Sequence, residues 1–268
     1  MQTDFITTVW DYYHEHGRHD LPWRRPAADG RLDPYAIMVS ELMLQQTQVS
    51  RVIPKYEAFL QQFPTVADLA QADLGDVLKA WSGLGYNRRA KFLWQTAGIV
   101  SRDFDNVFTP TVEGLVQLPG IGKNTAGAIL AYAFNQPVVF IETNIRTIYI
   151  HHFFADRDDV ADAEILALVT DTLDRENPRE WYWALMDYGS YLKKTAGNAS
   201  LRSKAYIKQS AFHGSRRQVR GQILKALTAG EASLERLEFL ITDERLLAVL
   251  ADLVSEQLIS QTPEGYRL

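Results

Sequence analysis

LPGIGKNTAGAI, residues 118–129, is the most informative stretch of this 268-residue sequence. The pattern predicts that a helix ends near Gln117, that a turn with two alternating glycines follows, and that an apolar helix begins near Lys123. Glycine permits positive φ and close approach of another surface, and a helix start offers unpaired N–H groups to a phosphate. We therefore expect Gly120, Gly122 and Lys123 to bind a phosphate in a hairpin between two helices.

Two other interpretations of this stretch compete with a phosphate-binding hairpin. A nucleotide-binding P-loop would require a glycine at Gln117 and a serine or threonine at Asn124, so the sequence excludes it. A plain turn between two helices stays open.

Helical spacing of apolar residues extends over almost the whole chain, which predicts an all-α protein. After Lys208 we expect three further helices and a small hairpin over 259–268, which together suggest a winged-helix-like module. Helical spacing before Lys208 occurs in residues 35–48, 50–62, 74–81, 87–103, 123–134, 143–154, 162–174 and 180–192. The three later helices are expected over 216–227, 233–240 and 244–258.

Composition excludes several classes of protein. The sequence has no cysteine, which excludes disulfides, thiol catalysis and thiolate metal centres. No apolar run approaches membrane-spanning length, and the N-terminal residues lack the apolar core of a signal peptide. The net charge is −5, yet residues 188–230 contain nine Lys or Arg and no Asp or Glu. This basic stretch predicts either a phosphate-binding face or an ordinary solvated one.

Glu41 lies within an apolar helical pattern, between Met38 and Leu42. Apolar surroundings disfavour the charged form of a carboxylate, which suits a side chain that must donate a proton. Gln45 and Gln46 follow within two turns and offer amide groups to a ligand. A structural glutamate held by a basic partner is the alternative.

Six motifs occur in an order that resembles the MutY and endonuclease III superfamily of helix-hairpin-helix DNA glycosylases. They are LPWR (21–24), SELMLQQTQV (40–49), WSGLGYNRRA (81–90), LPGIGKNTAGAI (118–129), IETNIRT (141–147) and ALMDYG (184–189). The resemblance covers about residues 20–208, and the first two motifs resemble the MutY, or adenine DNA glycosylase, branch.

The resemblance implies two α-helical subdomains that grip duplex DNA and flip the target nucleotide into a pocket. We expect a six-helix subdomain with the hairpin over 26–135 and a second helical subdomain over 1–25 plus 136–208. The second would end in a loop over 193–209, and the winged-helix-like module would occupy 209–268.

The same resemblance assigns roles to individual residues. Glu41 matches the catalytic acid that protonates the leaving adenine. Gln45, Gln46 and Tyr86 match residues that enter the opened base stack, with a core aromatic as the alternative for Tyr86. Trp23 and Arg24 would line the base pocket. The residues expected to contact the DNA backbone are Arg88, Arg89, Gly120, Gly122 and Lys123.

Three positions depart from the family's pattern. Glu142 replaces the aspartate that stabilises the cationic sugar, and its extra methylene shifts the position of the carboxylate. The alternative to a catalytic role is that Glu142 is an acid at a helix start, where the helix dipole favours it. Asn124, expected in the base pocket, replaces the lysine that forms a Schiff base in bifunctional relatives, so we expect little or no lyase activity. Trp183, also expected in the pocket, replaces a Gln or Glu that reads the flipped base, and an indole can stack on any base.

The family's iron–sulfur cluster has no counterpart in this sequence. Aligned without gaps, its four cysteine positions fall on Lys193, Ser200, Ser203 and Gln209, which cannot hold such a cluster. We therefore expect no cofactor and no metal. We hypothesise that the basic loop keeps a DNA-facing role through Lys193, Lys194 and Arg202.

The sequence thus predicts a monomeric, monofunctional DNA glycosylase of base excision repair, cytoplasmic and nucleoid-associated if bacterial. Its expected partner is double-stranded DNA with a damaged or mispaired base, and adenine opposite guanine or 8-oxoguanine is the favoured target. One alternative is the same fold excising another base, such as thymine or uracil opposite guanine, or a deaminated or alkylated purine. The other is a DNA lesion-binding protein without catalysis.

Overall fold

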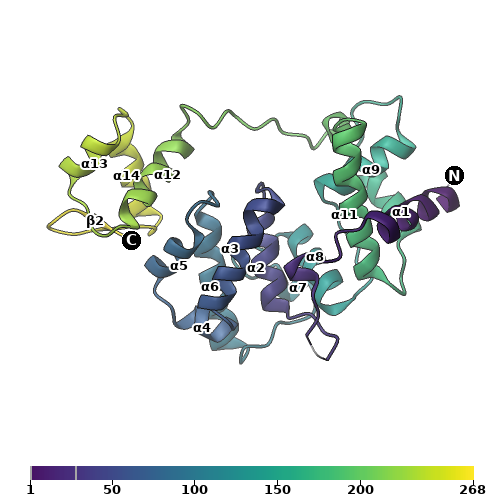
Figure 1. The fold of residues 1–268 in the computed structure, drawn as a ribbon, viewed down its shortest axis with the longest axis horizontal. Helices are drawn as coiled ribbons and strands as arrows, with labels where there is room; N and C mark the ends of the chain where they lie inside the picture. Colours follow the sequence, from purple (N-terminus) through teal and green to yellow (C-terminus); the bar gives the residue numbers. More distant parts are fainter. Residues whose placement is uncertain (1, 28) are drawn as a thin grey trace. The chain divides into compact units, whose positions relative to one another are not determined.

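The structure is a computed structural model that describes residues 2–27 and 29–268 (Figure 1). Helices dominate it, which confirms the predicted all-α class. The elements before residue 209 are α1 (Gln2–His16), η1 (Pro22–Arg24), α2 (Pro34–Leu44), α3 (Val49–Gln62), α4 (Val66–Gln71), α5 (Leu74–Trp81), α6 (Arg88–Asp103), α7 (Val112–Leu115), α8 (Lys123–Phe134), α9 (Thr143–Phe153), α10 (Asp162–Thr172), α11 (Pro178–Thr195) and η2 (Ala199–Arg202). Within the part of the chain that is described, no helix is long and apolar enough to cross a membrane.

Packing of the backbone divides the chain into two compact units. Unit 1 comprises Met1–Ile37, Thr109–Gln117 and Ile121–Lys208, and unit 2 comprises Met38–Phe108, Leu118–Gly120 and Gln209–Leu268. The predicted subdomains group the helices differently, because they keep 26–135 together and separate 209–268. The predicted subdomains concern which parts of the chain fold as domains. Packing in the folded chain does not test this, so they stay a prediction.

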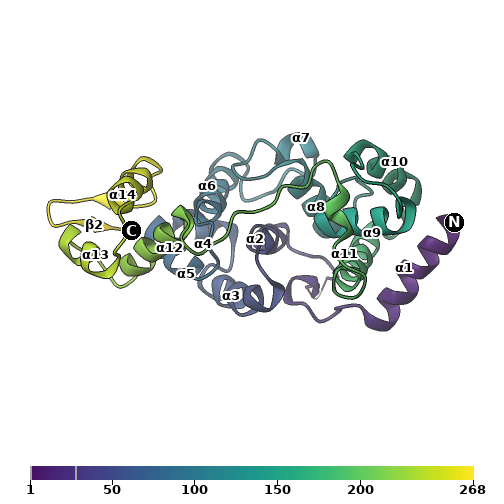
Figure 2. The same ribbon diagram turned by 90° about the horizontal axis from the view of Figure 1, so that it is seen from above.

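Unit 1 is built on the long helix α11, against which α1 and α9 pack (Figure 2). Aromatic rings fill the contact: the ring centroid of Phe5 in α1 lies 5.1 Å from that of Tyr149 and 6.3 Å from that of Trp181. All three side chains are buried. Burial of rings this large supplies much of the free energy that fixes α9 and α11 relative to each other. The candidate residue Glu142 directly precedes α9, and Trp183 lies in α11.

Unit 2 is built on α6, against which α4 and α5 pack. Amphipathic α3 buries Val52, Tyr56 and Phe59, and the ring of Phe59 meets that of Trp81 edge-on at a centroid distance of 6.1 Å. Helix α6 begins at Arg88, directly after the turn that contains Tyr86. The core therefore fixes the start of α6 and the turn that precedes it.

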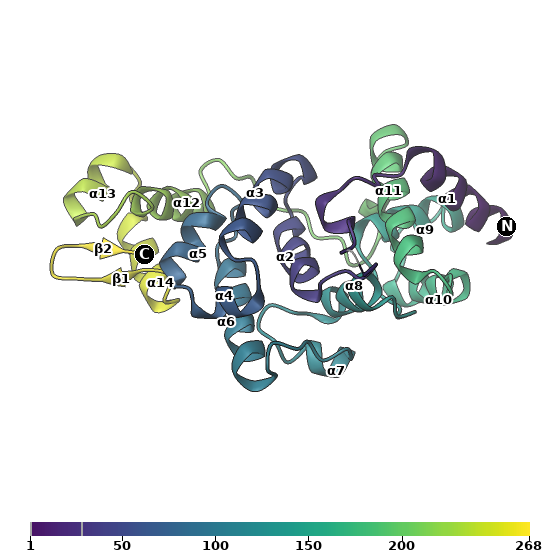
Figure 3. The same ribbon diagram turned by 60° about the horizontal axis from the view of Figure 1, so that its bottom comes forward.

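The C-terminal part of unit 2 confirms the predicted helices and hairpin (Figure 3). It consists of α12 (Arg216–Leu227), α13 (Leu234–Leu240), α14 (Leu246–Ser255) and the antiparallel strands β1 (Ser260–Gln261) and β2 (Tyr266–Arg267). Ser215 and Ser233 cap α12 and α13 by accepting a hydrogen bond from a backbone N–H. The strands pair with Ser260 opposite Arg267.

Candidate active site

The two glycines before α8 meet different structural requirements. Gly120 has a φ of +77°, and a Cβ atom there would lie 2.8 Å from the Cβ of Phe92. Gly122, the N-cap of α8, has a φ of −87°, and none of the described atoms lies within 4 Å of where its Cβ would be. The fold therefore requires glycine at 120, whereas the glycine at 122 keeps the exposed start of α8 open to a ligand.

Glu41 lies near the end of α2, where the helix buries Met38, Leu42 and Met43. Its own side chain is half-buried. The helix ends at Leu44, earlier than the predicted residue 48, and Gln46 adopts a φ of +56° that an α-helix cannot continue through. Gln45 and Gln46 thus lie in a turn that directly follows the helix carrying the candidate acid.

Arg89 holds this turn from α6. Its guanidinium makes six hydrogen-bond contacts, to the carbonyl oxygens of Leu42 (2.5 Å), Met43 (3.1 Å), Gln45 (2.6 Å), Leu84 (3.3 Å) and Gly85 (3.1 Å) and to Oγ1 of Thr47 (3.3 Å). The residue is only 7% exposed, and burial lowers the pKa of the guanidinium to about 10. The prediction that Arg89 follows the DNA backbone is therefore wrong, because its charged group is turned inward onto backbone carbonyls.

Tyr86 is 38% exposed and has a φ of +47°. Its hydroxyl accepts a hydrogen bond of 2.7 Å from Nε2 of Gln209, and the same amide donates to Oε1 of Gln46. The structure therefore brings together two of the predicted insertion residues. Arg88 is exposed and pairs with Glu256 at 2.7 Å.

Glu142 is the N-cap of α9 and has a φ of −109°. Burial raises the pKa of its carboxyl, and the charges of Arg146 and Lys193 and the N–H of Thr143 offset part of that shift. Arg146 is itself held by Asp162 at 2.8 and 2.6 Å. The second candidate carboxylate is thus partly desolvated, with two cations acting on it.

Lys193 is directed into the protein. Its ammonium donates to Oδ1 of Asn144 at 2.6 Å, and burial lowers its pKa while the charge of Glu142 opposes that shift. Lys193 was expected on a DNA-facing surface, and the structure instead places it in the electrostatic environment of Glu142.

Arg24 is buried in an ion-pair cluster that sequence reasoning missed. Its guanidinium pairs with both carboxylate oxygens of Asp187, at 2.8 and 2.9 Å, and Arg18 donates to the same carboxylate through Nε and its backbone N–H, both at 2.7 Å. Burial alone would raise the pKa of Asp187, but the hydrogen bonds and charges of the two arginines outweigh it and lower the pKa. Asp187 is the one acid in the apolar run 181–189, a signal that could have pointed to it.

Trp183 stacks on Tyr132, with ring centroids 6.1 Å apart and planes 22° apart, and Cζ of Arg24 lies 5.1 Å from the centroid of its ring. Trp183 and Arg24 line a cavity of about 800 Å³ in unit 1, together with Trp10, Tyr13 and other residues of α1. Trp23 is buried, and Asn124 is exposed at the start of α8, where its Oδ1 accepts from the N–H of Ile141 at 3.5 Å. Two of the four predicted base-pocket residues thus share one cavity.

The basic loop after α11 is folded by hydrogen bonds. Arg202 donates to the carbonyl of Phe154 at 2.9 Å and also to that of Ala155, at the end of α9. Oγ of Ser200 donates to Asn198 at 2.7 Å, and the backbone of Ser203 forms a bridge with Val160. Lys194 is exposed. These contacts, and the hydroxyls where a cluster would need thiolates, do not fit an iron–sulfur cluster.

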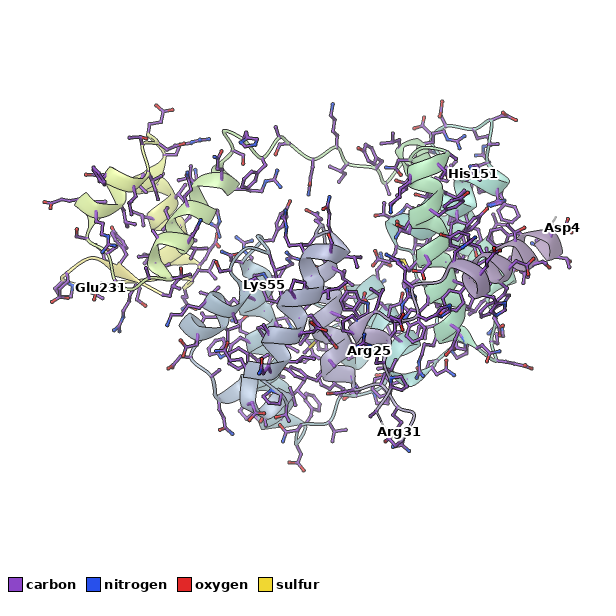
Figure 4. All side chains as sticks on the ribbon, in the orientation of Figure 1. Asp4, Arg25, Arg31, Lys55, His151 and Glu231 are labelled. Carbon is purple, nitrogen blue, oxygen red and sulfur yellow. The ribbon has the colours of Figure 1, made fainter. Side chains whose placement is uncertain are left out.

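The histidines show no metal-binding arrangement. Between residues 2 and 27 and from 29 onward, no three or more His, Asp or Glu side chains gather closely enough to hold a metal ion. His151 of α9, labelled in Figure 4, packs its ring against that of His152 with centroids 5.0 Å apart.

Comparison with known proteins places this geometry in a family. The family described as "HhH-GPD superfamily base excision DNA repair protein" matches residues 39–169. The adenine DNA glycosylase of Mycobacterium tuberculosis (strain H37Rv) is 33% identical over 279 residues, which cover 94% of this chain and 90% of that protein. The adenine DNA glycosylase of Buchnera aphidicola subsp. Baizongia pistaciae is 40% identical over 149 residues, 56% of this chain but only 41% of the Buchnera protein.

Solved structures show the same fold. A thermostable thymine-DNA glycosylase matches with a TM-score of 0.61 and 22% identity, over 70% of this chain and 86% of that chain. Endonuclease III in a non-covalent complex with DNA matches with a TM-score of 0.60 and 15% identity, over 73% of this chain and 88% of that chain. From the long match to the mycobacterial enzyme and the family match together, the chain belongs to the HhH-GPD superfamily of base excision DNA repair proteins.

Proposed function

We propose that this chain is a monofunctional DNA glycosylase that releases adenine from a mispair with guanine or 8-oxoguanine in duplex DNA, acting as a monomer. The position of Glu41 carries the proposal: a half-buried carboxyl group near the end of an apolar helix, directly before a turn with two glutamines. Similarity to adenine DNA glycosylases over 94% of the chain supports adenine as the base.

In the proposed reaction, Glu41 donates its proton to a ring nitrogen of adenine as the bond between C1′ and the base breaks. Adenine leaves poorly as an anion and readily once protonated, so this proton transfer lowers the barrier. The electron pair of the broken bond goes to the base, and C1′ becomes an oxocarbenium ion. The carboxylate of Glu142 stabilises that cation and orients water, whose oxygen bonds to C1′ while its proton passes to a carboxylate. The products are adenine and an abasic site.

The side chain at 124 supports hydrolysis without strand cleavage. A lyase needs an amine that attacks C1′ to form a Schiff base, and the amide of Asn124 is not nucleophilic. Lys123 is the next residue, but a helical step of one residue turns a side chain by about 100°. We therefore propose that strand breaks appear only when the abasic product is treated with alkali.

A second candidate function is the same reaction on another base. The side chain at position 183 is the observation that supports it. Its indole carries one N–H donor and no acceptor for the exocyclic amine of adenine. Other bases to compare are thymine and uracil opposite guanine and deaminated or alkylated purines.

Glycosylase assays on duplexes carrying each of these bases test the proposal. Wild type should release free adenine, detected by chromatography, and Glu41→Gln should reduce the single-turnover rate by about a thousandfold, within the range expected for loss of general acid catalysis. Glu57→Gln, on the exposed surface of α3, is the matched control and should behave as wild type. Duplex binding without release of any base would refute the enzyme, and strand breaks without alkali would refute the monofunctional reaction.

A further inference from the structure

The exposed ring of Tyr86 is held by residues from the C-terminal part of the chain. Its hydroxyl accepts from Gln209 at 2.7 Å and also from Nη1 of Arg217. Cζ of Arg217 lies 5.5 Å from the ring centroid, and Cζ of Arg89 lies 5.4 Å from it. Arg217 is in turn held by the carbonyl of Ser210 at 2.6 Å. An exposed tyrosine with positive φ is therefore fixed by two donors that lie more than a hundred residues away in sequence.

The same contacts reach the turn after α2. The amide of Gln209 donates both to Tyr86 and to Oε1 of Gln46, so one side chain joins the two turns. Both turn residues have left-handed backbones, with φ of +47° for Tyr86 and +56° for Gln46. Such conformations persist where the surroundings fix them.

Residues 209–268 are anchored beside Tyr86 through Glu256. Its carboxylate pairs with Arg88 at 2.7 Å and with Arg220 of α12 at 3.0 and 2.6 Å, while its carbonyl accepts from Lys91 at 2.5 Å. Burial would raise the pKa of Glu256, but hydrogen bonds and charges from the two arginines outweigh it and lower the pKa. Arg88 and Lys91 belong to the first turn of α6, which begins two residues after Tyr86. The anchor therefore sets the distance from α12 to Tyr86.

We propose that residues 209–268 are a positioning module for DNA insertion, in which Gln209 and Arg217 hold Tyr86 and Gln46 ready to enter the opened duplex. The proposal rests on the proposed function for the roles of Tyr86 and Gln46. Ordering these side chains before DNA binds spares the entropy that binding would otherwise cost. Arg217 and Gln209 are positioning residues, because they act through Tyr86.

The test uses a duplex with a tetrahydrofuran abasic-site analogue opposite guanine. This probe offers a gap to the insertion residues whichever base the enzyme releases, so failure of the substrate assignment does not affect the result. Tyr86→Phe removes the hydroxyl and keeps the ring. We expect Tyr86→Phe and Arg217→Met each to weaken binding by about tenfold, the size expected for loss of a charged hydrogen bond. Arg216→Met is the matched control: it is the neighbouring residue, its Nε bonds Asp252 at 3.0 Å, and it should bind as wild type.

A double-mutant cycle separates positioning from direct DNA contact and from misfolding. If Arg217 acts through Tyr86, Arg217→Met should weaken binding much less in the Tyr86→Phe background than in wild type, because only its contact with the ring is left to lose. The slope of affinity against salt should also stay at the wild-type value, since no phosphate contact is lost. Additive losses, or a salt slope reduced by about one, would overturn the proposal. Wild-type binding by Tyr86→Phe would overturn it too.

Discussion

Arg89→Met should destabilise unit 2 more than any surface substitution nearby, because Arg89 ties the end of α2 to the turn before α6. The substitution keeps an unbranched apolar side chain in the same space and removes the donors. Carbonyl oxygens of Leu42, Met43 and Gln45 near the end of α2 would lose their contacts with the guanidinium, at 2.5, 3.1 and 2.6 Å.

The magnitude follows from those contacts. Hydrogen bonds to a charged group contribute roughly 1.5–3 kcal/mol each, and the two shortest, to Leu42 and Gln45, are the strongest of the six. Two such bonds give roughly 3–6 kcal/mol. Burying the guanidinium, which lowers its pKa, offsets part of this gain. We expect the unfolding free energy to fall by about 3 kcal/mol.

Arg88→Met is the matched control, since Arg88 is the adjacent arginine, exposed, with one ion pair to Glu256. Exposed ion pairs contribute about 0–1 kcal/mol, so its loss should be small. Urea denaturation followed by circular dichroism gives both values, and hydrogen exchange should show faster exchange in residues 42–48 only for Arg89→Met. If the two variants differ by less than about 1 kcal/mol, the assignment of Arg89 as the clamp of this turn is wrong.

Five further substitutions test other parts of the site. Asp187→Asn should lower the unfolding free energy by about 3 kcal/mol in urea denaturation, because it leaves buried Arg24 without its ion pair; the wild-type contribution should be present above pH 3.8 and lost as pH falls through the lowered pKa of Asp187. The rate of base release in single-turnover assays should rise as pH passes the raised pKa of Glu142. Lys193→Met should move that rise to higher pH, because the charge of Lys193 stabilises the ionised form of Glu142. Identical pH profiles of wild type and variant would contradict an electrostatic interaction between Lys193 and Glu142. Gly120→Ala should lower the unfolding free energy by about 1–2 kcal/mol, because of the positive φ and the contact of the new Cβ with Phe92. Gly122→Ala should lower it by less than about 0.5 kcal/mol but should weaken duplex binding. Equal losses of stability in the two variants would contradict this contrast. Trp183→Gln should raise the ratio of release rates of adenine to unsubstituted purine, since an amide accepts from the exocyclic amine, and an unchanged ratio would remove Trp183 from base recognition.

Much of the fold could be predicted because its boundaries are encoded locally. The start of α8 at Lys123 and the helices of the C-terminal part follow from glycine and serine positions that act within a few residues. The end of α2 could not be predicted in this way. Apolar spacing continues to residue 48, but the helix ends at Leu44. There the guanidinium of Arg89, which lies over forty residues later in the sequence, donates hydrogen bonds to backbone carbonyl oxygens such as that of Leu42.

The candidate site shows the same division between local and distant causes. A carboxyl group in an apolar helix is visible in the sequence, so Glu41 could be proposed from it. Whether an arginine faces DNA or the interior depends on acceptors elsewhere in the chain: Arg24 finds Asp187, 163 residues away, and Arg202 finds the end of α9. Basic residues therefore predict a phosphate-binding surface only where the fold leaves their donors in solvent.

In the proposed base pocket, Trp183 limits how the enzyme can choose its base. An indole stacks and donates one hydrogen bond, and it cannot accept from the amine that distinguishes adenine from other purines. Stacking contributes affinity for every base, so it cannot supply the discrimination that a buried acceptor would. In the proposed mechanism the selection then moves to the chemical step, because a proton from Glu41 helps a base that leaves poorly as an anion. Uracil leaves as a comparatively stable anion and gains less from that proton. In the proposed mechanism, general-acid catalysis by Glu41 therefore favours purines as a class, and the partner base, which Tyr86 and Gln46 are proposed to contact, becomes the main source of identity.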